Sequence, residues 1–194
     1  MNFLANIYLS NGNPKIMVGN FIGDFVKGRN FSETYEADVA RGIELHRLID
    51  EYTDHHPVVQ QSKLKLRQKY RHYAAVIVDI FYDHFLSRYW TLYHPTPLPV
   101  FADAVYTMMK EHEAILPRAV KGMLPYMVKE NWLVNYGNFA GIGMALTGIS
   151  RRAKYGSKMD ESIHELKDFY DEFKAEFHSF MPDVKLASQQ FLNN

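Results

Sequence analysis

The sequence of 194 residues contains no cysteine, so disulfide bonds and thiolate metal sites are excluded. Any bound metal ion must therefore use histidine, aspartate or glutamate. An excess of charge of either sign is also missing, because 22 Lys and Arg residues balance 22 Asp and Glu residues. No overall basic field favours nucleic acid, and a charged partner would have to meet a local patch.

Long apolar runs are missing too, since none reaches the length of a membrane-spanning helix. The opening MNFLANIYLS has neither a basic leader nor a small-residue cleavage site. We therefore expect a cytoplasmic protein with no membrane partner. Hydrophobic residues make up 47% of the chain, which is enough for a sizeable core, and no repeat or linker divides it, so we expect one domain over 1–194.

Apolar residues recur mostly at spacings of three and four, whereas sustained alternation is scarce. This pattern predicts an all-α fold, a single-domain helical bundle. Three prolines within 94–99 predict a loop. The predicted helices cover 15–26, 33–53, 57–70, 74–90, 100–116, 117–136, 139–149 and 160–180.

The most apolar of these segments, VIVDIFYDHF, carries two carboxylates, Asp79 and Asp83. Four residues apart on a helix, they share a face and would repel unless a cation or a proton lies between them. A buried carboxylate needs such compensation. Two explanations remain open: a metal site, or a structural ion pair with Arg47 or Lys27.

The segment GIELHRLIDEYTD predicts a second helix face of the same kind. His46 and Asp50 are also four residues apart, and Asp54 follows after four more. Asp24 lies among apolar residues in GNFIGDFVKG. Such spacing is also common on solvated helix faces. If the two helix faces lie opposite each other, they could instead bind one metal ion between them. The predicted ligands are His46, Asp50, Asp79 and Asp83.

Imidazole and carboxylate ligands without thiolate suit Mn²⁺, Mg²⁺, Fe²⁺ or a catalytic zinc, and a set made mostly of carboxylates favours the harder ions. A metal there would lower the pKa of a bound water and polarise a phosphoryl oxygen, as phosphoester hydrolysis requires. His84 and Asp54 are candidates for handling protons.

A basic run, SKLKLRQKYRH, precedes the Asp79 segment. It could bind an acidic partner, or it could be an ordinary solvated helix face. No nucleic-acid motif accompanies it, so we expect no nucleic-acid partner. The predicted partner-binding residues are Lys63, Lys65, Arg67, Lys69 and Arg71.

In order and spacing, MNFLAN, GNFIGDFVKG, GIELHRLID and DIFYDHFLSRYW resemble the motifs of the acyl carrier protein phosphodiesterase family. Weaker likeness continues through NWL at 131–133 and SRR at 150–152. The family is regarded as a divergent branch of the HD-type metal-dependent phosphohydrolases, with an all-helical, HD-domain-like fold. The resemblance implies hydrolysis of the phosphodiester that joins 4′-phosphopantetheine to a serine of holo-acyl carrier protein, with Mn²⁺ as the expected metal.

By position, the resemblance implies that Asp24 serves the water-activating site beside the ligands named above, and that His84 handles protons. Family members typically have histidine at position 6, whereas this chain has Asn6, which cannot act as a general base. We expect Asn6 and Lys27 to contact the ligand residues and hold them in place without binding the metal ion themselves. The substrate, an acidic helical bundle, would dock on the basic run.

Two alternatives stay open at this point. The same metal site could act on a nucleotide or another small phosphoester. The chain could also be a catalytically silent helical protein that binds acyl carrier protein or a small ligand, and Asn6 is the best support for that alternative.

Overall fold

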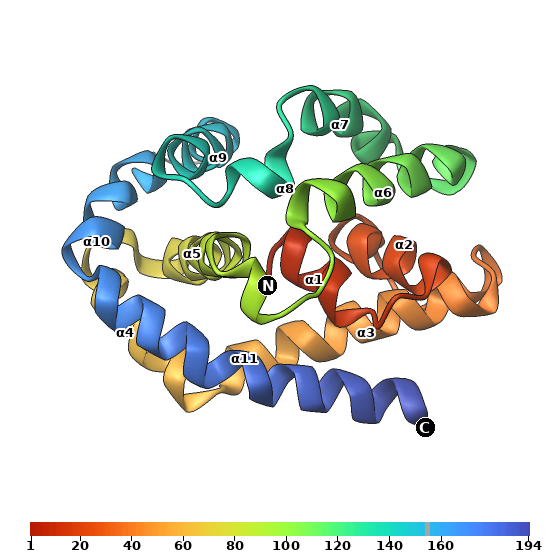
Figure 1. Cartoon of the computed structure of the whole chain (residues 1–194), viewed down its shortest axis with the longest axis horizontal. Coiled ribbons are helices and arrows are strands. Elements are labelled where there is room, and N and C mark those ends of the chain that lie inside the picture. The colour runs from red at the N-terminus through yellow and green to blue at the C-terminus, as the bar shows by residue number, and fades with distance from the viewer. Residues whose placement is uncertain (154–155) are drawn as a thin grey trace.

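The apolar segment that carries Asp79 and Asp83 forms the buried helix α5 (Ala74–Arg88), which lies left of the centre in Figure 1. Its side chains are buried around almost the whole circumference, Asp83 and His84 included. A helix of this kind must be covered on every side. The helices α1, α4, α9 and α11 pack around it.

The computed structural model describes residues 1–153 and 156–194, which form an all-α domain with no strand among them. The predicted fold class is thereby confirmed. Alongside α5, the helices are α1 (Phe3–Leu9), α2 (Pro14–Ile22), α3 (Ala37–His55), α4 (Pro57–Tyr70), α6 (Leu98–Glu111), α7 (Arg118–Lys129), α8 (Trp132–Asn135), α9 (Phe139–Arg152), α10 (Ile163–Asp168) and α11 (Tyr170–Asn193).

Most predicted helices are present, but two are divided and one helix was not predicted. The stretch 117–136 breaks at Asn131, whose left-handed backbone (φ 42°) ends α7 before α8 begins. The stretch 160–180 becomes α10 and α11, separated at Phe169. The opening segment forms α1, which the sequence pattern did not reveal.

The helices α2 and α3 cross with their backbones in contact at two glycines. A Cβ atom on Gly42 would lie 2.2 Å from the carbonyl oxygen of Ile16, and one on Gly19 would lie 2.0 Å from that of Val39. Only glycine permits this approach. The crossing holds the carboxyl end of α2 against the middle of α3, where the candidate site lies.

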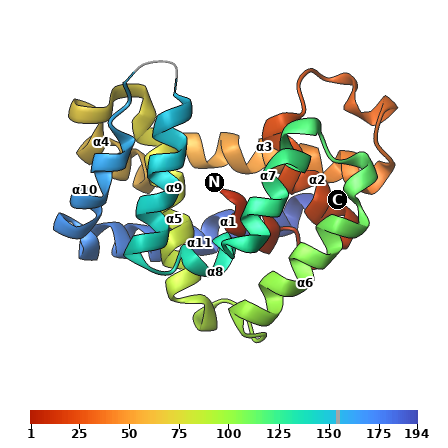
Figure 2. The ribbon, with the colours of Figure 1, turned by 90° about the horizontal axis from the view of Figure 1, so that it is seen from above.

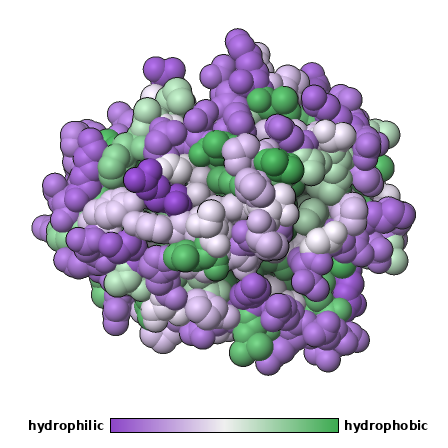
Figure 3. All heavy atoms as spheres, viewed as in Figure 1, coloured by the Kyte–Doolittle hydropathy of each residue, from purple (hydrophilic) through white to green (hydrophobic). Residues whose placement is uncertain are grey.

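The long helix α11 packs along α3, α4 and α5, as Figure 1 shows. On another side, the amino-terminal end of the chain lies between α9 and α7 (Figure 2). Hydrophilic residues cover most of the face in Figure 3, with hydrophobic ones in small scattered groups. Within the described ranges, no helix combines the length and apolarity needed to cross a membrane.

Candidate active site

The candidate site is built around His46, which lies in the middle of α3 and is only 3% exposed. Its ring packs against Gly23, where a Cβ atom would come within 2.3 Å of the imidazole. Nδ1 of His46 donates to the backbone carbonyl of Asn20, 2.7 Å away. This hydrogen bond fixes the tautomer and leaves Nε2 directed at the carboxylates.

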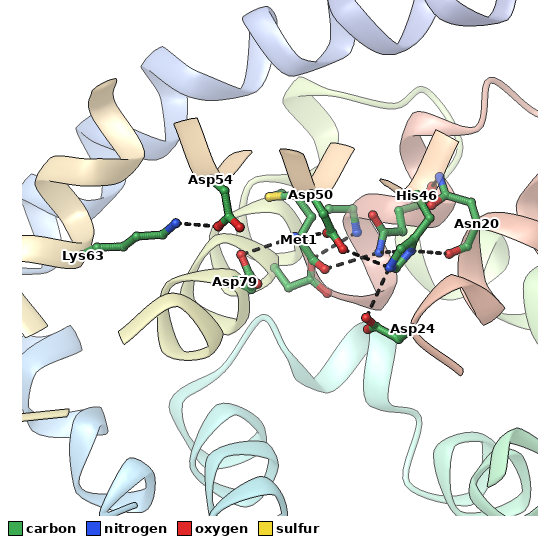
Figure 4. Close-up of polar contacts among 11 residues, drawn as sticks. Met1, Asn20, Asp24, His46, Asp50, Asp54, Lys63 and Asp79 are labelled. Atoms are coloured by element: carbon green, nitrogen blue, oxygen red, sulfur yellow. Dashed lines mark hydrogen bonds and ion pairs between the residues drawn. The ribbon is translucent and has the colours of Figure 1, made fainter. Parts of the chain in front are cut away.

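Two carboxylates converge on that nitrogen (Figure 4). Nε2 of His46 lies 3.3 Å from Oδ1 of Asp24 and 3.2 Å from Oδ2 of Asp50. Asp50 is one turn further along α3, whereas Asp24 comes from the short 3₁₀ turn Gly23–Phe25 after α2. One ligand atom from each of the three residues lies within 4.8 Å of the other two. We call Asp24, His46 and Asp50 the triad.

The pKa values of the histidine and the carboxylates in the triad depend on one another. Burial alone would lower the pKa of His46, but the two carboxylates beside Nε2, from Asp24 and Asp50, outweigh that effect and raise the pKa to about 9. Burial would likewise raise the pKa of Asp50, but the contact with His46 leaves it below its usual range. Without a metal ion, a proton on Nε2 thus balances the carboxylates.

The α-amino group of Met1 forms a second cationic centre beside the triad. Its nitrogen lies 3.3 Å from Oδ1 of Asp50 and 3.3 Å from Oδ1 of Asp79. Burial acts to lower its pKa, but the two carboxylates raise it to about 10. Asp79 therefore has a charged partner in Met1 rather than in Arg47 or Lys27, the partners that the structural alternative named.

Asp83 contacts the start of α1 and is not a member of the triad. Its two oxygens accept hydrogen bonds from the backbone N–H groups of Leu4 (2.8 Å) and Ala5 (3.0 Å), and its side chain is fully buried. A carboxylate at a helix amino terminus satisfies unpaired donors and interacts favourably with the helix dipole. Burial nevertheless raises the pKa of Asp83 to about 7. The structure therefore places Asp83 beneath α1 and not beside the triad.

His84 lies on another side of α5. Its Nδ1 bonds to the backbone carbonyl of Tyr136 (2.8 Å), and its Nε2 lies 3.2 Å from the hydroxyl of Tyr170. Burial lowers the pKa of His84 to about 4, which keeps the ring neutral. The structure does not bring this residue to the triad.

The predicted supporting residues lie close by. Nδ2 of Asn6 lies 3.3 Å from Nδ1 of His46, on the side of the ring away from the carboxylates, and donates to the carbonyl of Met1. Lys27 donates to the backbone carbonyl of Asp24 and not to its carboxylate. Asn6 thus contacts the ring of His46 from behind.

A cleft of about 590 Å³ opens in front of the acidic residues. Asp24, Asp50, Asp54 and Asp79 line it, and Asp54 forms an ion pair with Lys63 (2.7 Å). Arg152, at the end of α9, is the single Lys or Arg among the described residues that line the cleft. Among the described residues that line the cleft, Arg152 thus offers a positively charged side chain to an anionic substrate.

The five residues of the predicted partner surface differ in what they contact. Lys65 pairs with Glu172 and Glu176 of α11, and Lys69 pairs with Glu161 and Glu165. Arg67 and Arg71 form no ion pair with any described residue. Together with Lys63, they line a shallow hollow that shares Asp54 and Ala75 with the cleft.

The sequence of the chain was compared with known protein families. The family model described as acyl carrier protein phosphodiesterase matches residues 1–184. The chain belongs to the acyl carrier protein phosphodiesterase family. All three triad residues lie inside the matched region.

Three relatives, each named acyl carrier protein phosphodiesterase, resemble the chain over nearly its whole length. The protein from Photorhabdus laumondii is 35% identical over 183 residues, which are 94% of this chain and 92% of the relative. The protein from Pectobacterium atrosepticum is 30% identical over 99% of this chain and the whole relative. The protein from an Enterobacter species is 33% identical over 97% and 98% of the two chains. No solved structure matches significantly.

The family assignment confirms the resemblance seen in the sequence, whereas the link to HD-type phosphohydrolases stays a prediction. The donor set in this family member fits a divalent cation on structural grounds. Nε2 of His46 is buried without a well-formed hydrogen bond, and two carboxylates face it. One imidazole and two carboxylates are ligands that suit Mn²⁺, Fe²⁺ or Mg²⁺.

Sequence reasoning missed four contributors to the site in this family member. The α-amino group of Met1 and the carbonyl of Asn20 act through the backbone, which carries no residue-type signal. Gly23 could have been suspected from its position one helical turn after Gly19. Arg152 lies in the SRR segment, where only a weak likeness was apparent.

Proposed function

We propose that the chain hydrolyses the phosphodiester that links 4′-phosphopantetheine to a serine of holo-acyl carrier protein, releasing the apo-protein. We further propose that the reaction depends on a divalent cation, Mn²⁺ in the first place and Mg²⁺ or Fe²⁺ as alternatives. The observation that carries this proposal is the triad at an acidic cleft in a chain of the acyl carrier protein phosphodiesterase family.

The triad residues would hold the cation through Nε2 of His46 and the carboxylates of Asp24 and Asp50. When bound, such a cation supplies a water of lowered pKa and an electrophilic contact for a phosphoryl oxygen. The hydrogen bond from Nδ1 of His46 to the Asn20 carbonyl keeps the ring oriented for that purpose. Asn6 contacts the same ring and restricts its rotation.

Two further carboxylates at the cleft are available for proton transfer. Asp79 lines the cleft and burial raises its pKa, which favours proton transfer from this group to the leaving serine oxygen. Asp54 is more exposed and paired with Lys63, and its carboxylate can accept a proton from water. Asp54 and Asp79 therefore form the proposed acid–base pair. In this proposal Asp83 holds α1 in place instead of binding the cation.

The basic hollow beside the cleft supports an acidic protein as the substrate. Arg67 and Arg71 face solvent without carboxylate partners among the described residues, and the hollow meets the cleft at Asp54. An acidic carrier protein bound there would have its serine-linked arm next to the triad. Electrostatic complementarity of this kind mainly raises the rate of association.

The test is intact-mass analysis of holo-acyl carrier protein after incubation with the protein and Mn²⁺. We expect loss of the phosphopantetheine mass with the wild type, and no loss with EDTA or with Asp24→Asn. Asp103→Asn, which changes an exposed carboxylate on α6, serves as the matched control and should remain active.

Each negative outcome selects an alternative. Loss of the prosthetic group in the presence of EDTA would exclude the metal-dependent mechanism. Bound Mn²⁺ without loss of mass would favour a nucleotide or another small phosphoester as the substrate. Neither metal binding nor loss of mass would favour the silent binding protein.

A further inference from the structure

A second cavity lies next to the acidic cleft, bounded by the start of the chain and by α8 and α9. Its volume is about 210 Å³. Its lining is mostly apolar, although the polar residues Asn2, Glu130, Asn135 and Arg152 also contribute to it. The residues that form its walls include Trp132, Tyr136, Met144, Ala145, Gly148 and Ile149.

The two cavities share a wall. Four residues, Asn2, Phe3, Ile149 and Arg152, line both of them, so the two cavities are adjacent. Met144, at 59% exposure, is unusually accessible for an apolar residue on this helix. The arrangement therefore combines a polar compartment for the chemistry with an apolar compartment beside it.

Arg152 lies where the two cavities meet. It forms no ion pair or hydrogen bond with the residues that the structure describes, although four carboxylates line the neighbouring cleft. Arginine binds phosphate oxygens through a planar fork of donors and loses little hydration in doing so. Arg151, its neighbour in the last turn of α9, lines neither cavity.

We propose that Arg152 binds a phosphate oxygen of the phosphopantetheine group and that the apolar cavity receives the far end of the pantetheine arm. This inference rests on the proposed function and specifies how its substrate is recognised. The phosphodiester would lie between Arg152 and the triad, and the arm would pass Ile149 into the cavity.

The size of the cavity sets what it can receive. Sites for drug-sized ligands usually measure about 300–1,000 Å³, so this cavity is suited to a short segment and not to the whole arm. The thiol end of the arm is its least polar part and matches the apolar lining. The amide groups nearer the phosphate would remain at the shared wall.

Two pairs of substitutions on α9 test the two halves of the proposal. Arg152→Gln removes the phosphate contact, and Arg151→Gln removes the same charge one residue away. Gly148→Leu fills the cavity, and Gly143→Leu adds the same side chain elsewhere on the helix. No atom lies within 4 Å of a Cβ at Gly148 or Gly143, and leucine favours helix more than glycine, so both leucine variants should fold.

The measurement is calorimetric binding of 4′-phosphopantetheine and of pantetheine, which lacks the phosphate, to the full chain with Mn²⁺. Arg152→Gln should weaken binding of phosphopantetheine about 10- to 100-fold, as expected for a hydrogen bond between charged groups, and change pantetheine binding less than about 2-fold. Gly148→Leu should weaken both ligands by about 10-fold or more. Arg151→Gln and Gly143→Leu should match the wild type.

The proposal is overturned if the wild type binds neither compound, or if either variant behaves like its control. The same experiments distinguish an error in this recognition proposal from an error in the proposed phosphodiesterase function. Cleavage of holo-acyl carrier protein without these binding effects would refute only the recognition by Arg152 and the cavity. The expected binding pattern without cleavage would refute only the phosphodiesterase activity.

Discussion

Replacing Gly42 with alanine tests the close crossing of α2 and α3. The added methyl group would lie 2.2 Å from the carbonyl oxygen of Ile16 and 2.8 Å from the backbone nitrogen of Asn20, whereas real Cβ contacts stay above 3.0 Å. Both neighbours are backbone atoms, so no side-chain rotation can relieve the collision. The two helices would have to move apart.

Three contributions determine the magnitude. Overpacking of a rigid interior costs about 1–3 kcal/mol, and the movement strains the buried hydrogen bond from His46 to the Asn20 carbonyl, worth about 1 kcal/mol. Alanine recovers about 1 kcal/mol of helix propensity relative to glycine. The variant should therefore lose about 2 kcal/mol of unfolding free energy, which corresponds to a fall in Tm of about 4–8 °C for a chain of this size.

Gly122→Ala provides the matched control. Gly122 lies in the interior of α7, where a Cβ atom would meet nothing within 4 Å. The same substitution should there raise the unfolding free energy by about 0.5–1 kcal/mol. Urea unfolding followed by circular dichroism measures both values under one set of conditions.

The two variants should differ in sign, and a further measurement shows whether the crossing supports the site. Gly42→Ala should weaken binding of Mn²⁺, because separation of the helices moves the Asn20 carbonyl that orients His46. Equal stability of the two variants within about 0.5 kcal/mol would refute the reasoning about the crossing. Unchanged Mn²⁺ binding in a destabilised Gly42→Ala protein would refute its link to His46.

Three other predictions concern the metal, a buried histidine and the partner surface. Mn²⁺ at 100 times its Kd should stabilise the wild type by about 2.7 kcal/mol, raising Tm by about 5–11 °C, whereas Asp24→Asn should show no such rise in a thermal scan. Burial lowers the pKa of His84 to about 4, so the unfolded chain binds the proton more readily and stability should fall by up to about 3 kcal/mol as the pH drops from 6.5 to 4. His84→Gln should flatten that dependence in urea unfolding, and an unchanged dependence would assign it to other groups. Arg67→Glu combined with Arg71→Glu should raise KM for holo-acyl carrier protein about 10-fold at low salt and less at high salt, and an equal effect of Lys110→Glu would contradict a local docking surface.

The sequence predicted the site correctly where one helix supplies two of its residues. The four-residue spacing of His46 and Asp50 placed both side chains on one face of α3, and they do lie 3.2 Å apart. The same four-residue rule did not predict where Asp79 and Asp83 lie, because Asp79 lines the cleft whereas Asp83 contacts α1. Asp83 accepts hydrogen bonds from the first turn of α1, and because α1 was not predicted as a helix, its unpaired N–H groups were not considered.

Helix boundaries were predictable where proline marked them and not where tertiary packing determined them. Pro57 begins α4 as expected, since proline suits the first turn of a helix. The break at Phe169 has no such marker, and neither does the left-handed residue Asn131. Those breaks depend on how the neighbouring helices pack, which local sequence does not specify.

The acidic lining of the cleft also has a consequence for product release. A phosphodiester carries one negative charge, whereas a phosphomonoester carries about 1.5 to 2 at neutral pH. In the proposed reaction, hydrolysis therefore increases the repulsion between the phosphate group and the carboxylates of Asp54 and Asp79, and it also strengthens the attraction of that group to Arg152 and to a cation at the triad. The balance of these charges would then set how fast phosphopantetheine leaves, so the ionic strength should change the rate of product release.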